Sequence, residues 1–183
     1  MPLDWIYPDC SDMDYFEFYD LPVQFQIDQS ELKKRFFQKT RENHPDFYTN
    51  ASEEEKVLAL EQSSFNNKAY KVLSNEDSRI KYILELLGVI VTGQKDELPN
   101  EFLFEMMELN ENIEAATTEN DEPKREEIKQ QLLNQQAVEL DHIKQQLSNH
   151  QHKEDQFNPE STKHAYFKLK YFKRALENLS SNA

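Results

Sequence analysis

The chain contains very little cysteine and glycine, and these absences limit what it can be. Among its 183 residues there is one cysteine, Cys10, and there are two glycines, Gly88 and Gly93. A single cysteine excludes an internal disulfide and a cysteine-rich zinc site. Scarce glycine, little β-branching and 31% charged residues favour helices joined by compact turns over strands. We therefore expect an all-α protein.

Long hydrophobic runs and an excess of positive charge are also missing. No apolar run approaches the roughly 20 residues that span a bilayer. Residues 1–7 contain neither the basic nor the apolar region of a secretory signal. These absences lead us to expect a cytoplasmic protein. The net charge of −14 argues against nucleic-acid binding, which needs a basic surface.

Proline positions and helical periodicity define the expected domains. Proline lacks a backbone donor and disfavours helix in the residue before it, so the prolines beyond the first ten residues mark helix boundaries. The expected helices cover about 12–19, 29–43, 52–73, 76–87, 100–118, 123–150 and 160–180. Both glycines fall within residues 88–98, which we interpret as a short linker. The expected organisation is an arm over 1–11, a helical domain over 12–87 and a three-helix domain over 99–183.

Local signals support individual helices. Asp28 with Glu31 three residues later forms a capping-box pattern, and Gly88 is placed as a helix-terminating glycine. The glutamine-rich stretch 130–151 could be low-complexity sequence. A helical stripe nevertheless continues through it, and we expect that stripe to consist of Leu133, Ala137, Leu140, Ile143 and Leu147.

A run of positive charge ends at a tip that contains proline. The helix over 29–43 carries five cations with no acid between positions 33 and 41: Lys33, Lys34, Arg35, Lys39 and Arg41. Such a run usually marks a solvated helix face. Here it ends at His44-Pro45-Asp46, where Pro45 stops the helix and leaves the histidine and the aspartate exposed. The next helix returns beside the first as an antiparallel hairpin, with Phe65, Ala69, Val72 and Leu73 facing Leu32 and Phe36.

These features resemble a J-domain over residues 12–87. The resemblance is carried by the opening segment from Asp14 to Pro22, by Leu32 and Phe36, by Asn67-Lys68-Ala69-Tyr70 with Leu73, and by Arg79 with Tyr82. Two positions depart from the pattern. Phe47 follows the aspartate where a basic residue is common, and Glu76 stands where many relatives have proline.

The J-domain resemblance implies a co-chaperone. In J-domains the tip and the basic second helix dock on a DnaK-class chaperone and favour its ATP hydrolysis. By that resemblance the chaperone-binding residues are His44, Pro45, Asp46, Lys33, Lys34 and Arg41. An exposed carboxylate at Asp46 suits a charge-assisted bond to a partner arginine. Exposed lysines and arginines would steer association with an acidic surface.

The helices over 100–118 and 160–180 contain more apolar residues than one core-facing stripe uses. The first has a core stripe of Phe102, Met106, Leu109, Ile113 and Ala116, which leaves Leu103, Phe104 and Met107 on other faces beside Glu108 and Glu111. The second has a core stripe of Thr162, Ala165, Leu169, Phe172, Leu176 and Leu179, which leaves Phe167 and Tyr171 off it. Such a surplus indicates either burial on two sides or an interaction site. A three-helix bundle needs one stripe per helix, which favours the interaction site.

The order of the domains resembles the HscB family of iron–sulfur cluster biogenesis. Residues 102–111 and 168–172 are similar to two stretches of that family's C-terminal domain, although Asn110 stands where an arginine is frequent. By residue-wise similarity, the positions that contact the cluster scaffold IscU are Leu103, Phe104, Met107, Glu108, Glu111 and Tyr171. The implied partners are a DnaK-class chaperone (HscA or DnaK) and an IscU-like scaffold, with no cofactor and no metal.

The sequence leaves two alternative functions, an enzyme and a co-chaperone for a different client. An enzyme is disfavoured because there is no glycine-rich phosphate loop, nucleophile–base pair or metal-binding spacing. The histidines of the second half are interpreted as surface residues: His142, His150, His152 and His164. The other alternative is a general J-domain co-chaperone whose C-terminal helical domain binds a different client. The favoured function is stimulation of a DnaK-class ATPase with delivery of an iron–sulfur scaffold to it.

Overall fold

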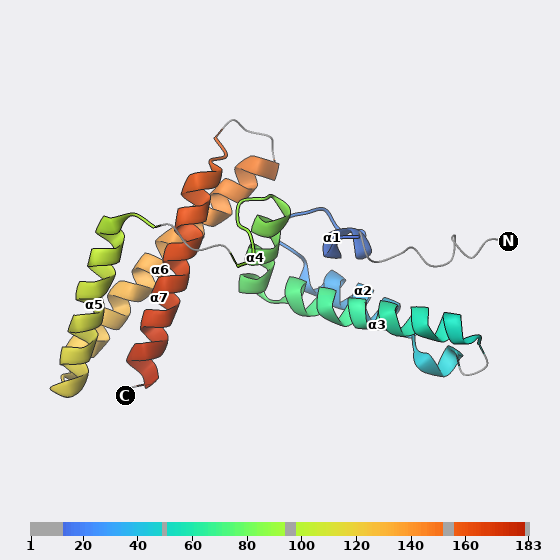
Figure 1. The fold of residues 1–183 in the computed structure, drawn as a ribbon, viewed down its shortest axis with the longest axis horizontal. Coiled ribbons are helices and arrows are strands. Elements are labelled where there is room, and N and C mark those ends of the chain that lie inside the picture. Colours follow the sequence, from blue (N-terminus) through green and yellow to red (C-terminus); the bar gives the residue numbers. More distant parts are fainter. Residues whose placement is uncertain (1–12, 49–50, 94–97, 152–155, 182–183) are drawn as a thin grey trace. The chain divides into compact units, whose positions relative to one another are not determined.

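The computed structural model describes residues 13–48, 51–93, 98–151 and 156–181, and every regular element in these ranges is helical (Figure 1). The elements are α1 (Tyr15–Phe18), α2 (Gln29–Glu42), the 3₁₀ helix η2 (Pro45–Tyr48), α3 (Glu53–Ser74), α4 (Glu76–Leu86), α5 (Asn100–Thr118), α6 (Glu122–Gln151) and α7 (Pro159–Ser181). The expected all-α class is therefore confirmed. The expected N-terminal arm, with Cys10, and His152 lie outside the described residues.

Local capping explains where the helices begin. The Asp28 carboxylate accepts hydrogen bonds from the backbone N–H groups of Ser30 and Glu31 at 2.8 and 3.3 Å. The predicted reciprocal bond from Glu31 is not made, because that carboxylate binds Arg35 instead. A complete capping box is found at α3, where Ser52 and Glu55 exchange both hydrogen bonds. After α4, Gly88 has a φ of +66°, the left-handed conformation that glycine adopts most easily.

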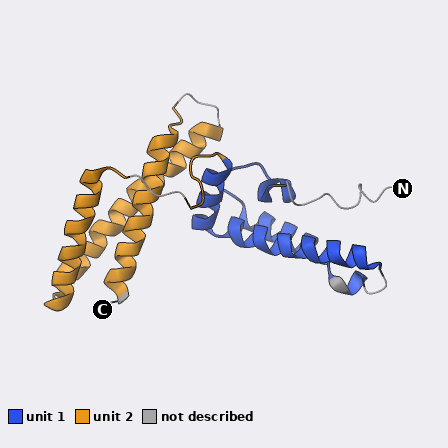
Figure 2. Ribbon diagram, in the orientation of Figure 1, with its two compact units in different colours: residues 1–86 blue, residues 87–183 orange. Residues whose placement is uncertain are grey.

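Two compact units divide the chain between Leu86 and Leu87 (Figure 2). In the first unit, α2 and α3 pack against each other, and α1 and α4 both pack on α3. Its core consists of fully buried side chains that include Phe16, Tyr19, Leu32, Leu73, Ile80 and Leu84. The Phe36 ring stacks on Tyr70 with 4.3 Å between ring centres, which joins the two arms of the hairpin.

The second unit is built from α5, α6 and α7, and α7 contacts both other helices. The expected core stripe of α5 is confirmed, since all five of its members are buried. The prediction for α7 was partly wrong because Phe167, placed off the core, is 6% exposed. A helix that packs against two neighbours buries a wider stripe than a helix with one neighbour.

The stripe predicted along α6 was also wrong in its first half. Leu133 is 39% exposed and Ala137 is exposed, whereas Ile128 and Leu132 are buried. Ile143 and Leu147 are buried as expected. The described part of residues 88–98, which we interpreted as a linker, contains three buried apolar side chains: Val89, Ile90 and Leu98.

Candidate partner-binding surfaces

The His-Pro-Asp tip stands between the end of α2 and the start of α3. The side chains of His44 and Asp46 are 46% and 85% exposed, so neither is withdrawn into the core. His44 Nδ1 accepts the backbone N–H of Asp46 at 3.3 Å and lies 3.5 Å from its Oδ2 atom. Pro45 occupies the first position of η2, where a helix needs no N–H donor. The tip therefore presents one carboxylate and one imidazole to solvent.

Hydrogen bonds tie this tip to the hairpin. Asn43 is buried, and its side-chain amide donates to the carbonyl of Lys39 at 3.1 Å, which satisfies the end of α2. The Tyr48 hydroxyl donates to the Glu42 carbonyl at 3.1 Å, which connects η2 back to α2. These bonds hold the short helix in place, although the sequence patterns did not predict it.

The five cations of α2 divide into two groups. Arg35 donates to the backbone carbonyls of Tyr19 and Asp20, and the Lys39 ammonium lies 4.9 Å from the centre of the Phe18 ring. These two cations therefore hold α1 against α2. The other three are exposed: Lys33, Lys34 and Arg41. They are the same three that sequence similarity assigns to chaperone binding.

Apolar side chains lie among the charged residues of this surface, and sequence reasoning missed them. Phe37 is 54% exposed and falls midway between Lys33 and Arg41, four residues from each. At about 100° per residue, these three side chains share one helix face with Lys34. Beside the tip, Asp46, Tyr48, Lys56 and Leu60 line part of a hollow of about 390 Å³. The sequence could have revealed Phe37 as part of this surface, because it stands four residues from a cation on either side.

The outer face of α5 combines apolar and acidic side chains. Phe104 and Met107 are 69% and 59% exposed, and Glu108 and Glu111 are exposed beside them. Exposed apolar side chains of this size, rimmed by acids, are typical of interaction sites. We call these four residues the α5 surface.

Two other predicted scaffold contacts are less exposed than the α5 surface. Leu103 and Tyr171 are only half-buried rather than exposed. The Tyr171 ring packs edge-on against the buried Phe102, with 5.9 Å between ring centres and an angle of 87°. Tyr171 therefore stabilises the contact between α5 and α7. Asn110 donates to the Met106 carbonyl of its own helix at 2.8 Å.

α5 has an unbalanced charge. It carries five glutamates and no basic residue: Glu101, Glu105, Glu108, Glu111 and Glu114. All five are exposed, and none forms an ion pair with another residue in the parts of the chain that the structure describes. Unpaired carboxylates around an apolar centre favour a partner with basic residues.

Other kinds of site find no support within the described ranges. No group of three or more histidine, cysteine, aspartate or glutamate side chains there is arranged to hold a metal ion. None of the described helices is long and apolar enough to cross a membrane. His142 contacts Ser161 at 3.2 Å and His164 lies 3.9 Å from Glu160, so both make ordinary local contacts.

Comparison with known proteins shows which family the chain is related to. Residues 98–180 match the family described as "HSCB C-terminal oligomerisation domain". The co-chaperone protein HscB homolog of Psychromonas ingrahamii is 36% identical over 138 residues, which cover 75% of this chain and 81% of that protein. The chain belongs to the HscB family. The HscB homolog of Vibrio cholerae is 37% identical over 106 residues, which span 57% of this HscB-family chain and 62% of that relative.

Solved structures extend the similarity to the whole HscB fold. The crystal structure of the human co-chaperone protein HscB has a TM-score of 0.75 at 30% identity, and the match covers 96% of this chain and 84% of that one. The chaperone HscB from Vibrio cholerae has a TM-score of 0.71 at 27% identity and covers 92% and 96%. The relatives are named co-chaperones, and both units of this chain fall within the HscB architecture.

Proposed function

We propose that this chain is a co-chaperone that stimulates the ATPase of a DnaK-class chaperone, HscA or DnaK, and delivers an IscU-like iron–sulfur scaffold to it. Membership of the HscB family supports the proposal. The single observation that carries it is the exposed Asp46 carboxylate on a tip that hydrogen bonds tie to a cationic helix. In this proposal the chain has no catalytic centre of its own, ATP hydrolysis occurs in the chaperone, and both proteins are cytoplasmic.

The chaperone-binding surface comprises the tip and the exposed cations of α2. Asp46 would accept a charge-assisted bond from a chaperone arginine. Lys33, Lys34 and Arg41 would attract an acidic surface before contact is made. Because the tip is already held by hydrogen bonds, little conformational entropy is lost when it docks.

The test of this surface is single-turnover ATP hydrolysis by a DnaK-class chaperone. We expect Asp46→Asn to lower the stimulated rate by at least about tenfold, since a hydrogen bond to a charged group contributes roughly 1.5–3 kcal/mol. Asp141→Asn is the matched control, because Asp141 is exposed on α6. Stimulation by Asp46→Asn equal to that of the wild type would exclude the proposed mechanism.

The scaffold-binding surface is the α5 surface together with Leu103 and Tyr171 at its edge. We expect Phe104→Ala combined with Met107→Ala to weaken scaffold binding by at least tenfold, about 1.4 kcal/mol. Stimulation of the ATPase without scaffold should not change. Val138→Ala is the control, since Val138 is 67% exposed on α6. If the double variant still bound the scaffold normally, a different client would be the better proposal.

A further inference from the structure

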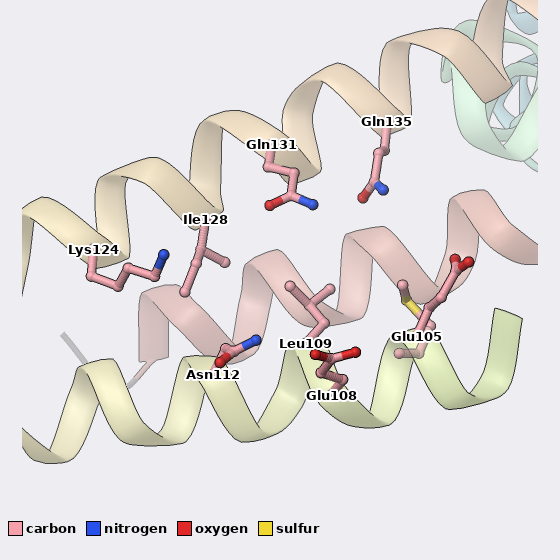
Figure 3. Close-up of a pocket in the computed structure, with 9 residues that line it drawn as sticks. Glu105, Glu108, Leu109, Asn112, Lys124, Ile128, Gln131 and Gln135 are labelled. Atoms are coloured by element: carbon pink, nitrogen blue, oxygen red, sulfur yellow. The ribbon is translucent and has the colours of Figure 1, made fainter. Parts of the chain in front are cut away.

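A groove runs between α5 and α6, beside the α5 surface (Figure 3). It has a volume of about 440 Å³. Met106, Leu109 and Ile128 contribute apolar side chains, and polar side chains from both helices surround them. Glu108 belongs both to the α5 surface and to the groove. A protein bound at the α5 surface would therefore also contact the edge of the groove.

The two ends of the groove differ in charge. Figure 3 shows Glu105 near one end and Lys124 near the other, with Glu108 and Asn112 between them. The groove has carboxylates towards its Glu105 end, whereas the Lys124 ammonium at the far end pairs with Glu127 at 2.9 Å. A ligand with a cation at the glutamate end matches this arrangement.

The dimensions suit a short extended peptide. Along α5, Glu105 and Asn112 are seven positions apart, which is about 10 Å at 1.5 Å per residue. An extended chain covers that length with about three residues.

The amide side chains supply what an extended backbone needs. Gln131 and Gln135 of α6 face Asn112 and Glu105 of α5 across the groove (Figure 3). The Gln135 Oε1 atom is buried and has no hydrogen-bond donor among the described residues. A buried acceptor without a donor is unfavourable. The Gln135 side chain is only half-buried, and its rotation towards the groove would let the backbone N–H of a bound segment satisfy the oxygen.

We propose that this groove binds an extended segment of about three residues of the client, with a lysine or arginine side chain between Glu105 and Glu108. The inference rests on the proposed function, since the client is the scaffold. The amides of Gln135 and Gln131 bind the backbone of the segment, and the carboxylates select the cation. The groove thereby adds a sequence-specific contact to the less specific apolar contact made by the α5 surface.

The experiment measures binding of a purified IscU-like scaffold by the full chain and two pairs of variants. Gln135→Leu is compared with Gln145→Leu, which alters an exposed glutamine of the same helix, and Glu105→Gln with Glu114→Gln, which alters an exposed acid of α5 outside the groove. We expect Gln135→Leu and Glu105→Gln each to weaken binding about three- to tenfold, with both controls within twofold of wild type. The Glu105→Gln loss should shrink at high salt.

A stability measurement separates binding from folding. Because Gln135→Leu removes an unsatisfied buried acceptor, its melting temperature should stay equal to that of the wild type or rise while its affinity falls. Wild-type affinity in Gln135→Leu and Glu105→Gln, with loss confined to Phe104→Ala combined with Met107→Ala, overturns the groove and keeps the proposed function. If the wild type does not bind the scaffold, both fail. If Gln135→Leu changes self-association in sedimentation but not scaffold affinity, the occupant is a second copy and the inference is overturned.

Discussion

Asn66 shows how one buried polar residue holds three helices of the first unit together. It is 1% exposed, and its Oδ1 atom accepts the Tyr19 hydroxyl at 2.6 Å. Its amide donates to the Thr40 hydroxyl at 3.0 Å and to the Phe36 carbonyl at 3.2 Å. The sequence motif that carried the J-domain resemblance contains the neighbouring Asn67, but the residue that makes these bonds is Asn66.

Replacing Asn66 should therefore be costly. Asn66→Leu removes the three hydrogen bonds of the Asn66 side chain, each of which contributes about 0.5–1.5 kcal/mol. The Tyr19 hydroxyl keeps the backbone carbonyl of residue 66 as an acceptor at 3.0 Å, and the Thr40 hydroxyl keeps its bond to the Phe36 carbonyl. We expect a loss of roughly 2–4 kcal/mol in the free energy of unfolding, measured by urea denaturation. Asn67→Leu is the control because Asn67 is exposed. Equal stabilities of the two variants would contradict the role given to Asn66.

Tyr82 makes the stability of the first unit depend on pH in the alkaline range. Its hydroxyl oxygen accepts the Tyr15 backbone N–H at 2.9 Å, and burial raises its pKa from 10.0 to about 12. A raised pKa means that the folded state holds the proton more tightly than the unfolded state. The protonated Tyr82 hydroxyl therefore contributes fully to the free energy of unfolding below pH 10, and this contribution is lost as the pH rises towards about 12.

We expect the melting temperature of the wild type to fall as the pH rises through this window. Tyr82→Phe should be less stable at neutral pH, because the Tyr15 N–H loses its acceptor, but its decline above about pH 10 should be shallower. Thermal unfolding followed by circular dichroism across the window checks this. Tyr19→Phe cannot serve as the control variant, since burial raises the pKa of Tyr19 as well. A decline of equal steepness in wild type and Tyr82→Phe would contradict the assignment.

At the scale of single elements, α3 depends on its N-terminal cap. Ser52 and Glu55 form the complete capping box, and the hydrogen bonds from Ser52 lower the pKa of the Glu55 carboxyl. We expect Ser52→Ala to lower the free energy of unfolding by about 1 kcal/mol. Ser64→Ala, at an exposed position within the same helix, should have little effect or stabilise slightly. Chemical denaturation of both variants distinguishes the cap from general helix propensity.

α2 has a structural side and a side free for a partner. Lys39 contacts α1 and Arg35 contacts the turn that follows it, whereas Lys33 and Lys34 are exposed, with the Lys34 ammonium 3.8 Å from Glu31 of the same helix. We expect Lys33→Glu combined with Lys34→Glu to slow association with the chaperone about tenfold at low salt, with less effect at high salt and with an unchanged melting temperature. Stopped-flow binding at two salt concentrations measures this. An association rate equal to that of the wild type at low salt would show that these lysines do not steer docking.

At the scale of the whole molecule, each compact unit carries one of the two proposed surfaces. The tip and basic helix belong to residues up to 86, and the α5 surface belongs to residues from 87 onward. If the units act separately, a fragment of residues 1–86 should fold, as checked by circular dichroism. It should stimulate the ATPase about as well as the full chain and fail to bind the scaffold. Scaffold binding by this fragment would contradict the division of roles.

How much of this could be predicted from sequence depends on the distance over which each interaction acts. The bounds of the expected helix over 100–118 agree with α5, and the exposed tip follows from a proline after a helix. Those features arise from caps, periodicity and proline geometry, which act within about one helical turn. The short η2 helix has no comparable signal, since its stability comes partly from the Tyr48–Glu42 bond.

The sequence by itself determined the helical class, the order of the helices and the residues of the tip, because backbone hydrogen bonding and side-chain periodicity are local. Only the tertiary structure decided which apolar and charged side chains are free. Phe167 is buried, Leu133 is exposed, and Arg35 is occupied by α1, because each outcome depends on which neighbour a helix face meets. The groove with the unsatisfied Gln135 likewise requires two helices to face each other, which no pattern along one helix contains.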